Sequence, residues 1–201
     1  MNFRKHALMK GETKASLLST TEKVTDVHES GGFKFKCIGA DLQFECVERD
    51  TNGVVFEIVD ADDHVRPVER SIRTVKEGIR CTIADVPFRR IPKIMTRSLV
   101  TLRTRNLNQF PSENGMSSSL SPLTIVTGEP KPDTRKFNLD FGSYVEVFED
   151  NGFMQNSTRT RRAPASGIGP TTRRKVSHHF MSLATWRRLR RKKWHEPPMP
   201  D

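Results

Sequence analysis

Two acidic residues and two basic residues in the first half of the chain have types and spacing that could support metal-dependent chemistry. Asp41 ends an apolar segment that is typical of a buried strand, and Glu69 lies in the first turn of a predicted helix. Carboxylates that come from a strand end and a helix start can share divalent metal ions. Arg73 and Lys76 follow on one face of that helix, where they could hold a phosphate backbone. This layout is typical of a metal-dependent enzyme that acts on polynucleotides.

Each of these residues also has an ordinary structural interpretation. Asp41 could cap a turn or be a solvent-exposed turn residue, and an acid at position 69 is favoured by the dipole of the helix whatever its function. Arg73 could pair with Glu77 one turn later as a surface salt bridge. The acidic run 60–64 lacks the glycine and distal glutamate of a calcium loop, so we predict a polar connection there. Spacing alone leaves both the metal site and the surface interpretation open.

The charge of the chain favours an anionic partner. Its 201 residues carry a formal net charge of +10, and the isoelectric point is about 9.9. Twelve Lys or Arg residues and no acid lie between positions 159 and 193. Phosphate contacts explain such a run better than a solvated basic tail, because like charges repel one another without a partner. The predicted nucleic-acid-binding residues are Arg73, Lys76, Arg159, Arg161, Arg162, Arg173, Arg174, Lys175, Arg187, Arg188, Arg190, Arg191, Lys192 and Lys193.

Cysteine and histidine usage argues against disulfides and zinc. Cys37 and Cys81 lie in apolar runs, so we expect reduced core residues, and the histidines form no zinc signature with the three cysteines. The N-terminus has no apolar signal core, and no apolar run approaches the length of a membrane span. We therefore expect an intracellular protein, with a nuclear location favoured, that is not secreted and does not contact a membrane.

Hydrophobic periodicity predicts an α/β protein. The strongest signal is a helix over 66–84, in which Val68, Ile72, Val75, Ile79 and Ile83 form a stripe that we expect to be buried. Further helices are predicted over 14–29, 93–109 and 122–126, the last with Ser121 as N-cap. The predicted strands of this part are 2–9, 33–40 and 54–59, with a helical turn over 42–47. A charged, proline-containing segment over 129–138 predicts a linker.

The last third of the chain changes character. Alternating residues predict strands over 141–148, 180–183 and 189–194, with loops between them. Several short strands over about sixty residues fit a small β-barrel or curled sheet. The predicted domains are therefore 1–128, followed by the linker and a small β domain over 139–198 that contains the basic segment.

Several motifs resemble, in order, the integrase region of a copia-type LTR-retrotransposon polyprotein. The resemblance runs over nearly the whole chain. It is carried by Ala40-Asp-Leu-Gln-Phe-Glu45, Val59-Asp-Ala-Asp-Asp-His-Val65, Val68-Glu-Arg-Ser-Ile-Arg-Thr-Val-Lys-Glu77, Pro87-Phe-Arg-Arg-Ile-Pro92, Leu107-Asn-Gln-Phe-Pro111, Leu120-Ser-Pro-Leu-Thr-Ile-Val-Thr-Gly128, Phe141-Gly-Ser-Tyr-Val145 and Trp194-His-Glu-Pro-Pro-Met-Pro200.

The resemblance implies a partial ribonuclease-H-like integrase core followed by a small SH3-like β-barrel. Such proteins insert element DNA into host DNA with two Mg²⁺ or Mn²⁺ ions held by an Asp-Asp-Glu triad. Matched by motif, Asp41 is the second acid and Glu69 the third, both metal ligands and catalytic, while Arg73 and Lys76 face the DNA end. The implied partners are DNA, with RNA as the alternative, and a second copy or the remainder of the polyprotein.

The chain also departs from the family pattern. The first catalytic Asp of the family lies upstream of any residue here, so we expect no catalysis by this chain alone. The alternative function is non-enzymatic nucleic-acid binding through the basic C-terminal segment. Residues 172–176 and Trp186 replace turn residues such as glycine, so turns with positive φ would be strained or rebuilt there.

Overall fold

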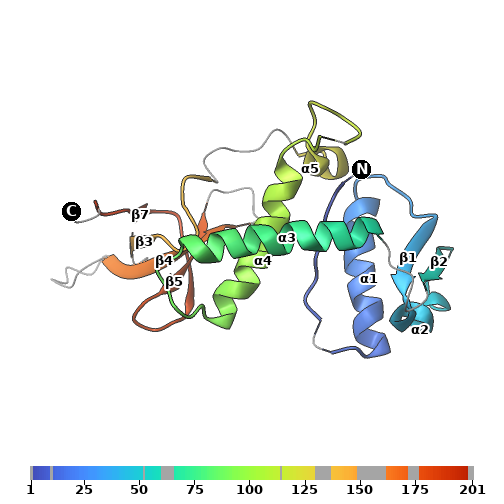
Figure 1. The fold of residues 1–201 in the computed structure, drawn as a ribbon, viewed down its shortest axis with the longest axis horizontal. Coiled ribbons are helices and arrows are strands. Elements are labelled where there is room, and N and C mark those ends of the chain that lie inside the picture. The colour runs from blue at the N-terminus through green and yellow to red at the C-terminus, as the bar shows by residue number, and fades with distance from the viewer. Residues whose placement is uncertain are drawn as a thin grey trace, which may run out of the picture. The chain divides into compact units, whose positions relative to one another are not determined.

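The structure, a computed structural model, describes residues 2–9, 11–51, 53–59, 66–113, 115–129, 137–148, 162–171 and 177–198. The chain forms two compact units: unit 1 comprises residues 1–77 and 104–132, and unit 2 comprises residues 78–103 and 133–201. Two helices, α3 (Arg66–Asp85) and α4 (Lys93–Gln109), contribute residues to both units (Figure 1). One division between the units falls within the predicted linker 129–138. The predicted domain assignment itself stays a prediction.

Unit 1 is built around a pair of parallel strands. These are β1 (Cys37–Asp41) and β2 (Val55–Val59), paired from Cys37 opposite Val55 to Asp41 opposite Val59. Parallel strands need a crossover connection, and a short 3₁₀ turn η1 (Leu42–Phe44) followed by α2 (Glu45–Glu48) supplies it. The remaining helices of this unit are α1 (Lys14–Glu29) and α5 (Pro122–Thr127). The predicted helices 14–29, 66–84, 93–109 and 122–126 are all confirmed within a residue or so at each end.

The ends of α5 show why the sequence predicted it well. The Ser121 hydroxyl accepts a hydrogen bond from the backbone N–H of Thr124 at 3.1 Å, and Pro122 occupies the first turn. Gly128 ends the helix in the left-handed conformation, with φ of 66°. Each terminal residue therefore has the chemistry that its position in a helix requires.

Unit 2 contains a five-stranded antiparallel sheet. Its strands are β3 (Tyr144–Phe148), β4 (Arg162–Pro170), β5 (His178–Ser182), β6 (Arg188–Arg191) and β7 (Trp194–His195), in the spatial order β6-β5-β4-β3-β7. β6 and β7 lie at opposite ends of this order although only two residues separate them in the chain. The sheet must therefore curl, and the Trp194 ring accordingly lies 4.4 Å from the ring of His178 on β5. The strand pairing does not close into a barrel.

Both faces of this sheet bury apolar side chains. On one face Leu139, Val145, Val147, Ala165 and Phe180 form a cluster, with Leu189 and Trp194 packed against it. On the other face the cluster consists of Met95, Ile168 and Met181, packed against Phe88, Ile91, Ile94, Phe141 and Leu183. The second cluster joins the start of α4 to the sheet, so unit 2 has its own hydrophobic core.

The expectation that the first strand and two of the cysteines are buried was wrong. β1 alternates between exposed and half-buried residues, and Cys37, Cys46 and Cys81 are all free thiols on the surface. In the part of the chain that the structure describes, β1 pairs only with β2. A strand with one neighbour is not covered on both faces as the central strands of a larger parallel sheet are.

Two further expectations were also wrong. The apolar stripe of α3 is not buried, because Val68 is 50% exposed, Ile72 49% and Ile83 39%. Residues 2–9 form no strand. Instead, the side-chain amide of buried Asn108 accepts a hydrogen bond from the Arg4 backbone N–H at 2.8 Å and donates one to its carbonyl at 2.6 Å. A side chain here satisfies the backbone groups that a neighbouring strand would satisfy.

Candidate nucleic-acid interface

The β5–β6 hairpin determines where the basic residues of unit 2 point. Directly opposite residues are Phe180 with Leu189, Met181 with Arg188 and His179 with Arg190. Opposite residues in an antiparallel pair share a face of the sheet. Phe180 and Leu189 pack into one core cluster, so Arg188 and Arg190 lie on the other face, and both are exposed.

Some of the predicted phosphate-binding arginines already have internal partners. Arg162 pairs with Glu146 at 3.0 Å, and its guanidinium lies 5.2 Å from the ring centroid of Phe148. Arg191 donates through Nε to the Phe148 carbonyl at 2.9 Å, and Arg190 donates through Nε to the Ser177 hydroxyl at 3.1 Å. Arg162 and Arg191 therefore help to hold the sheet together at the end of β3.

Other basic side chains of the same segment have no such partner. Arg187, Arg188, Lys192 and Lys193 are exposed and form no ion pair with any residue that the structure describes. Lys192 and Lys193 lie in the short connection between β6 and β7. These four cations are therefore available to an external anion.

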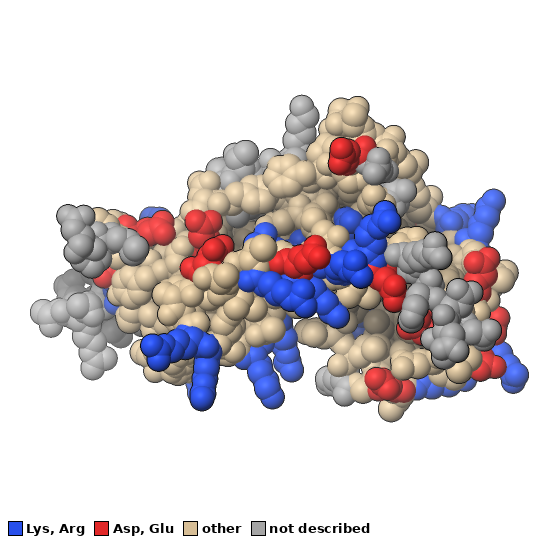
Figure 2. All heavy atoms as spheres, in the orientation of Figure 1, with Lys and Arg blue, Asp and Glu red and all other residues tan. Residues whose placement is uncertain are grey.

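A second group of basic residues, which the sequence analysis did not select, lies beside the same core cluster. Arg89, Arg90 and Lys93 are exposed. Their sequence neighbours Phe88, Ile91 and Ile94 pack against the cluster of Met95, Ile168 and Met181, as does Leu183 of the β5–β6 turn. Figure 2 shows Lys and Arg side chains projecting where Figure 1 places the β5–β6 turn and the start of α4. The adjacent Arg89-Arg90 pair between apolar residues was the signal in the sequence.

The electrostatics at His179 reflect this concentration of positive charge. Burial of the imidazole is the main cause that lowers its pKa below 6.5, and the charges of Arg188 and Arg190 lower it further. A nearby cation disfavours a second positive charge on the ring. The hairpin therefore carries its charge on the arginines and keeps the histidine neutral.

The predicted metal ligands lie in unit 1. Asp41 is the last residue of β1, and its exposed carboxylate makes no capping hydrogen bond to the 3₁₀ turn that follows. A capping role for Asp41 is therefore wrong, whereas the alternative of a solvent-exposed residue agrees with its exposure. The first turn of α3 carries Glu69, which is also exposed.

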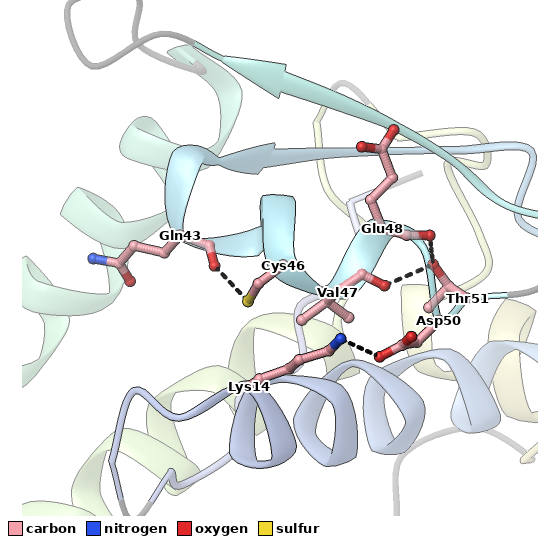
Figure 3. Close-up of polar contacts among 7 residues, drawn as sticks. All are labelled: Lys14, Gln43, Cys46, Val47, Glu48, Asp50 and Thr51. Carbon is pink, nitrogen blue, oxygen red and sulfur yellow. Dashed lines mark hydrogen bonds and ion pairs between the residues drawn. The ribbon is translucent and has the colours of Figure 1, made fainter.

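The turn after Asp41 is fastened by local contacts (Figure 3). The Cys46 thiol donates to the Gln43 carbonyl at 3.3 Å, and the Thr51 hydroxyl donates to the Glu48 carbonyl at 3.0 Å. Lys14 of α1 forms an ion pair with Asp50 at 2.9 Å. This pair is largely exposed and contributes little stability by itself. Buried Val47 supplies the apolar anchor of α2.

Arg73 and Lys76 are exposed on the part of α3 that belongs to unit 1. Arg73 does not pair with Glu77, so that alternative interpretation of its charge is wrong. Among the described residues, no group of three or more His, Cys, Asp or Glu side chains is placed to hold a metal ion. The run 60–64 and the predicted residues Arg159, Arg161, Arg173, Arg174 and Lys175 lie outside the described residues.

Among the comparisons with known proteins, only the comparison with solved structures gives matches. No protein-family model and no curated protein matches the chain. One similar solved structure is a chain of the simian T-cell lymphotropic virus intasome in complex with PP2A regulatory subunit B56 gamma. It has 12% sequence identity and a TM-score of 0.41, and the match covers 96% of this chain and 67% of that chain. At this TM-score the similarity does not establish a common fold. Within the described residues, none of the helices could cross a membrane.

Proposed function

We propose that this chain is an integrase-related protein whose own activity is nucleic-acid binding through unit 2. The observation that carries the proposal is the separation of charge between the units. The described part of unit 2 holds thirteen Lys and Arg residues against four Asp and Glu, whereas that of unit 1 holds twelve against thirteen. A concentration of one sign of charge attracts a polyanion and is otherwise unfavourable because the charges repel one another.

The interface consists of cations without an ion-pair partner among the described residues, which lie in the β5–β6 hairpin, in the connection from β6 to β7 and just before or at the start of α4. We name it the basic hairpin surface, and it comprises Arg89, Arg90, Lys93, Arg187, Arg188, Lys192 and Lys193. None of these side chains is part of a core cluster. Contacts of this kind are made to phosphates, so we expect affinity without strong sequence preference.

The salt dependence of binding tests this function. Each phosphate that a cation neutralises lowers the slope of log K against log salt concentration by about 0.9 for duplex DNA. If most cations of the basic hairpin surface contact phosphates, the slope for the full chain should lie between about −3 and −6. Fluorescence anisotropy with a labelled duplex over a series of salt concentrations gives this slope. A flat dependence, or no binding at low salt, would refute the proposed function.

The integrase relation assigns parts to the two units. We infer that the parallel strands and helices of unit 1 belong to a ribonuclease-H-like core and that the curled sheet of unit 2 corresponds to an SH3-like barrel. The βαβ-type crossover of unit 1 and the strand order of unit 2 support this assignment. The motif resemblance to copia-type elements names DNA integration as the ancestral activity. DNA or RNA, a second copy and the remainder of a polyprotein would then be its partners.

A second candidate function is metal-dependent polynucleotidyl transfer. It is favoured by Asp41, whose carboxylate is exposed at the carboxyl end of a parallel strand pair and makes no capping hydrogen bond to the turn that follows. Asp41 and Glu69 offer hard oxygen donors, which suit Mg²⁺ or Mn²⁺. When bound, such an ion would activate a nucleophile and stabilise charge on the phosphate. Arg73 and Lys76 would then position the DNA end.

The metal site predicts a measurable stabilisation. Millimolar Mg²⁺ or Mn²⁺ should raise the melting temperature of the wild type, corresponding to about 1.4 kcal/mol at ten times the dissociation constant. Asp41→Asn should abolish this rise because it removes a negative ligand. Asp26→Asn, which changes an exposed acid on α1, should keep it. A rise that persists in Asp41→Asn would exclude Asp41 as a ligand.

A further inference from the structure

The tip of the β5–β6 hairpin holds a tryptophan in an unfavourable backbone conformation. Five residues, 183–187, connect the strands, and a hydrogen bond from the Ser182 N–H to the Arg187 carbonyl at 3.0 Å closes the turn. Trp186 donates its own N–H to the Ser182 carbonyl at 2.9 Å. Its φ is 57°, and among the described residues it is the only one other than glycine with positive φ. A bulky L residue is rarely found in this region.

The side chain of Trp186 is not part of the hydrophobic core, so core packing does not explain this strain. It is 57% exposed. The other tryptophan, Trp194, is half-buried, and its ring contacts His178 and Phe180. The core clusters include Trp194 but not Trp186. Trp186 therefore combines two costs, backbone strain and exposed apolar surface, and it belongs to neither core cluster of the described residues. Strain that the fold does not explain points to a function.

The surroundings of Trp186 are cationic. Arg187 and Arg188 follow it directly, and both are exposed and unpaired among the described residues. Leu183, at the start of the same turn, packs against the cluster of Met95, Ile168 and Met181, and so do Ile91 and Ile94, which follow Arg89 and Arg90 in the chain. No acid occurs between positions 159 and 193. The exposed indole is thus part of the basic hairpin surface.

An indole among cations suits a ligand that has both negative charge and flat aromatic faces. A phosphate alone needs no aromatic partner, and a duplex buries the faces of its bases within the stack. Single-stranded nucleic acid presents both phosphates and unstacked bases. We propose that Trp186 stacks on an unpaired base of a single strand while Arg187 and Arg188 hold adjacent phosphates. This proposal rests on the proposed function and names its preferred substrate.

The φ of Trp186 provides a variant that removes the ring without damaging the turn. Glycine adopts positive φ without strain, so Trp186→Gly should keep or raise the melting temperature. Its affinity for a single-stranded oligothymidylate should fall between about 5-fold and 150-fold, as expected for the loss of one stacking contact. Affinity for a duplex of the same length should change less than about 2-fold. Trp186→Phe, which retains an aromatic ring, should keep most of the single-strand affinity.

A spectroscopic readout on the full chain separates stacking from charge. The difference in fluorescence between wild type and Trp186→Gly isolates the emission of Trp186. Oligothymidylate should quench this emission, whereas heparin, which has charge but no bases, should not. Trp186→Asn supplies a second variant that tolerates positive φ, should the glycine variant fail to fold.

Each other outcome has a distinct meaning. Unchanged single-strand affinity in Trp186→Gly, with wild-type binding intact, would overturn the stacking proposal and leave the proposed function standing. Equal losses of affinity for the single strand and the duplex would also overturn the stacking proposal, because Trp186 would then not contact the faces of unpaired bases. If Trp186 is needed for binding to phosphatidylserine vesicles but not for binding to oligonucleotides, a membrane contact would replace the stacking proposal. Failure of the wild type to bind any nucleic acid would refute both the stacking proposal and the proposed function.

Discussion

At the scale of single residues, the arginines of unit 2 divide by what they contact. Arg162 and Arg191 bind a carboxylate and a backbone carbonyl within the unit, so they stabilise the sheet. Arg187 and Arg188 are only a few positions away in the chain, yet they have no ion-pair partner among the described residues. An arginine with satisfied donors has fewer left for a phosphate. Charge counted from sequence cannot make this distinction, because it depends on which strands become neighbours.

His179 makes the stability of the protein depend on pH. Its pKa lies below 6.5 in the folded state, so the unfolded chain binds more protons as the pH falls past 6.5. The free energy of unfolding should therefore be highest well above pH 6.5 and decrease as the pH falls through 6.5 toward the lowered pKa of the folded state. His6, whose pKa is lowered by burial and by Lys5, acts in the same direction.

Thermal melts of two histidine variants over this pH range check the assignment. His179→Gln should show a weaker pH dependence than the wild type, since one of the two titrating contributions is gone. His195→Gln changes an exposed residue and should behave like the wild type. A wild-type stability that rises as the pH falls through this range would contradict the lowered pKa values.

At the scale of secondary-structure elements, a close backbone approach joins α1 to α5. A Cβ atom on Gly31, just after α1, would overlap the backbone carbonyl of Val126. Because the obstacle is backbone, it cannot move aside as a side chain could. Gly31→Ala should therefore lower the free energy of unfolding by about 1–3 kcal/mol.

Gly39 offers a matched control for this substitution. It lies in β1, its φ is not positive, and no atom lies within 4 Å of a Cβ built there. Gly39→Ala should change stability by no more than about 0.5 kcal/mol. Urea unfolding of both variants measures the difference. Equal effects at the two positions would show that α1 and α5 do not approach as closely as described.

The helices could be predicted from the sequence because their signals are local. Ser121, Pro122 and Gly128 mark both ends of α5, and the apolar period of 93–109 marks α4. β4 was missed although it is the longest strand and lies between β3 and β5. Its sequence, Arg162 to Pro170, contains two prolines and two glycines, which predict turns. Pairing on both sides overrides this local preference, and no local pattern reveals it.

Part of the candidate site could also be predicted, because its signal is local in the sequence. The basic run after position 159 identified Arg187 and Arg188 directly from composition. Arg89 and Arg90 were not selected, because their segment is linked to the hairpin only by the packing of Ile91, Ile94 and Leu183 against the same core cluster. The strain at Trp186 followed from its place in a turn that favours glycine, and its φ of 57° confirms that expectation.

At the scale of the whole molecule, the excess of positive charge and the candidate metal ligands belong to different units. Unit 2 carries the excess of cations, and unit 1 carries Asp41 and Glu69. The proposed function therefore assigns binding to one unit and the candidate metal ligands to the other. Loss of the metal ligands should leave the affinity of unit 2 for nucleic acid unchanged, since the two sets of residues are not shared.

The most direct test of the central claim compares duplex binding by two double variants of the full chain. One carries Arg187→Ala and Arg188→Ala on the basic hairpin surface, and the other carries Arg49→Ala and Arg70→Ala on exposed positions of unit 1. We expect the slope of log K against log salt concentration to become less steep by about 2 in the first variant, because two phosphate contacts are lost. The second variant should keep the wild-type slope. An unchanged slope in the first variant, or an equal loss in the second, would contradict binding through unit 2.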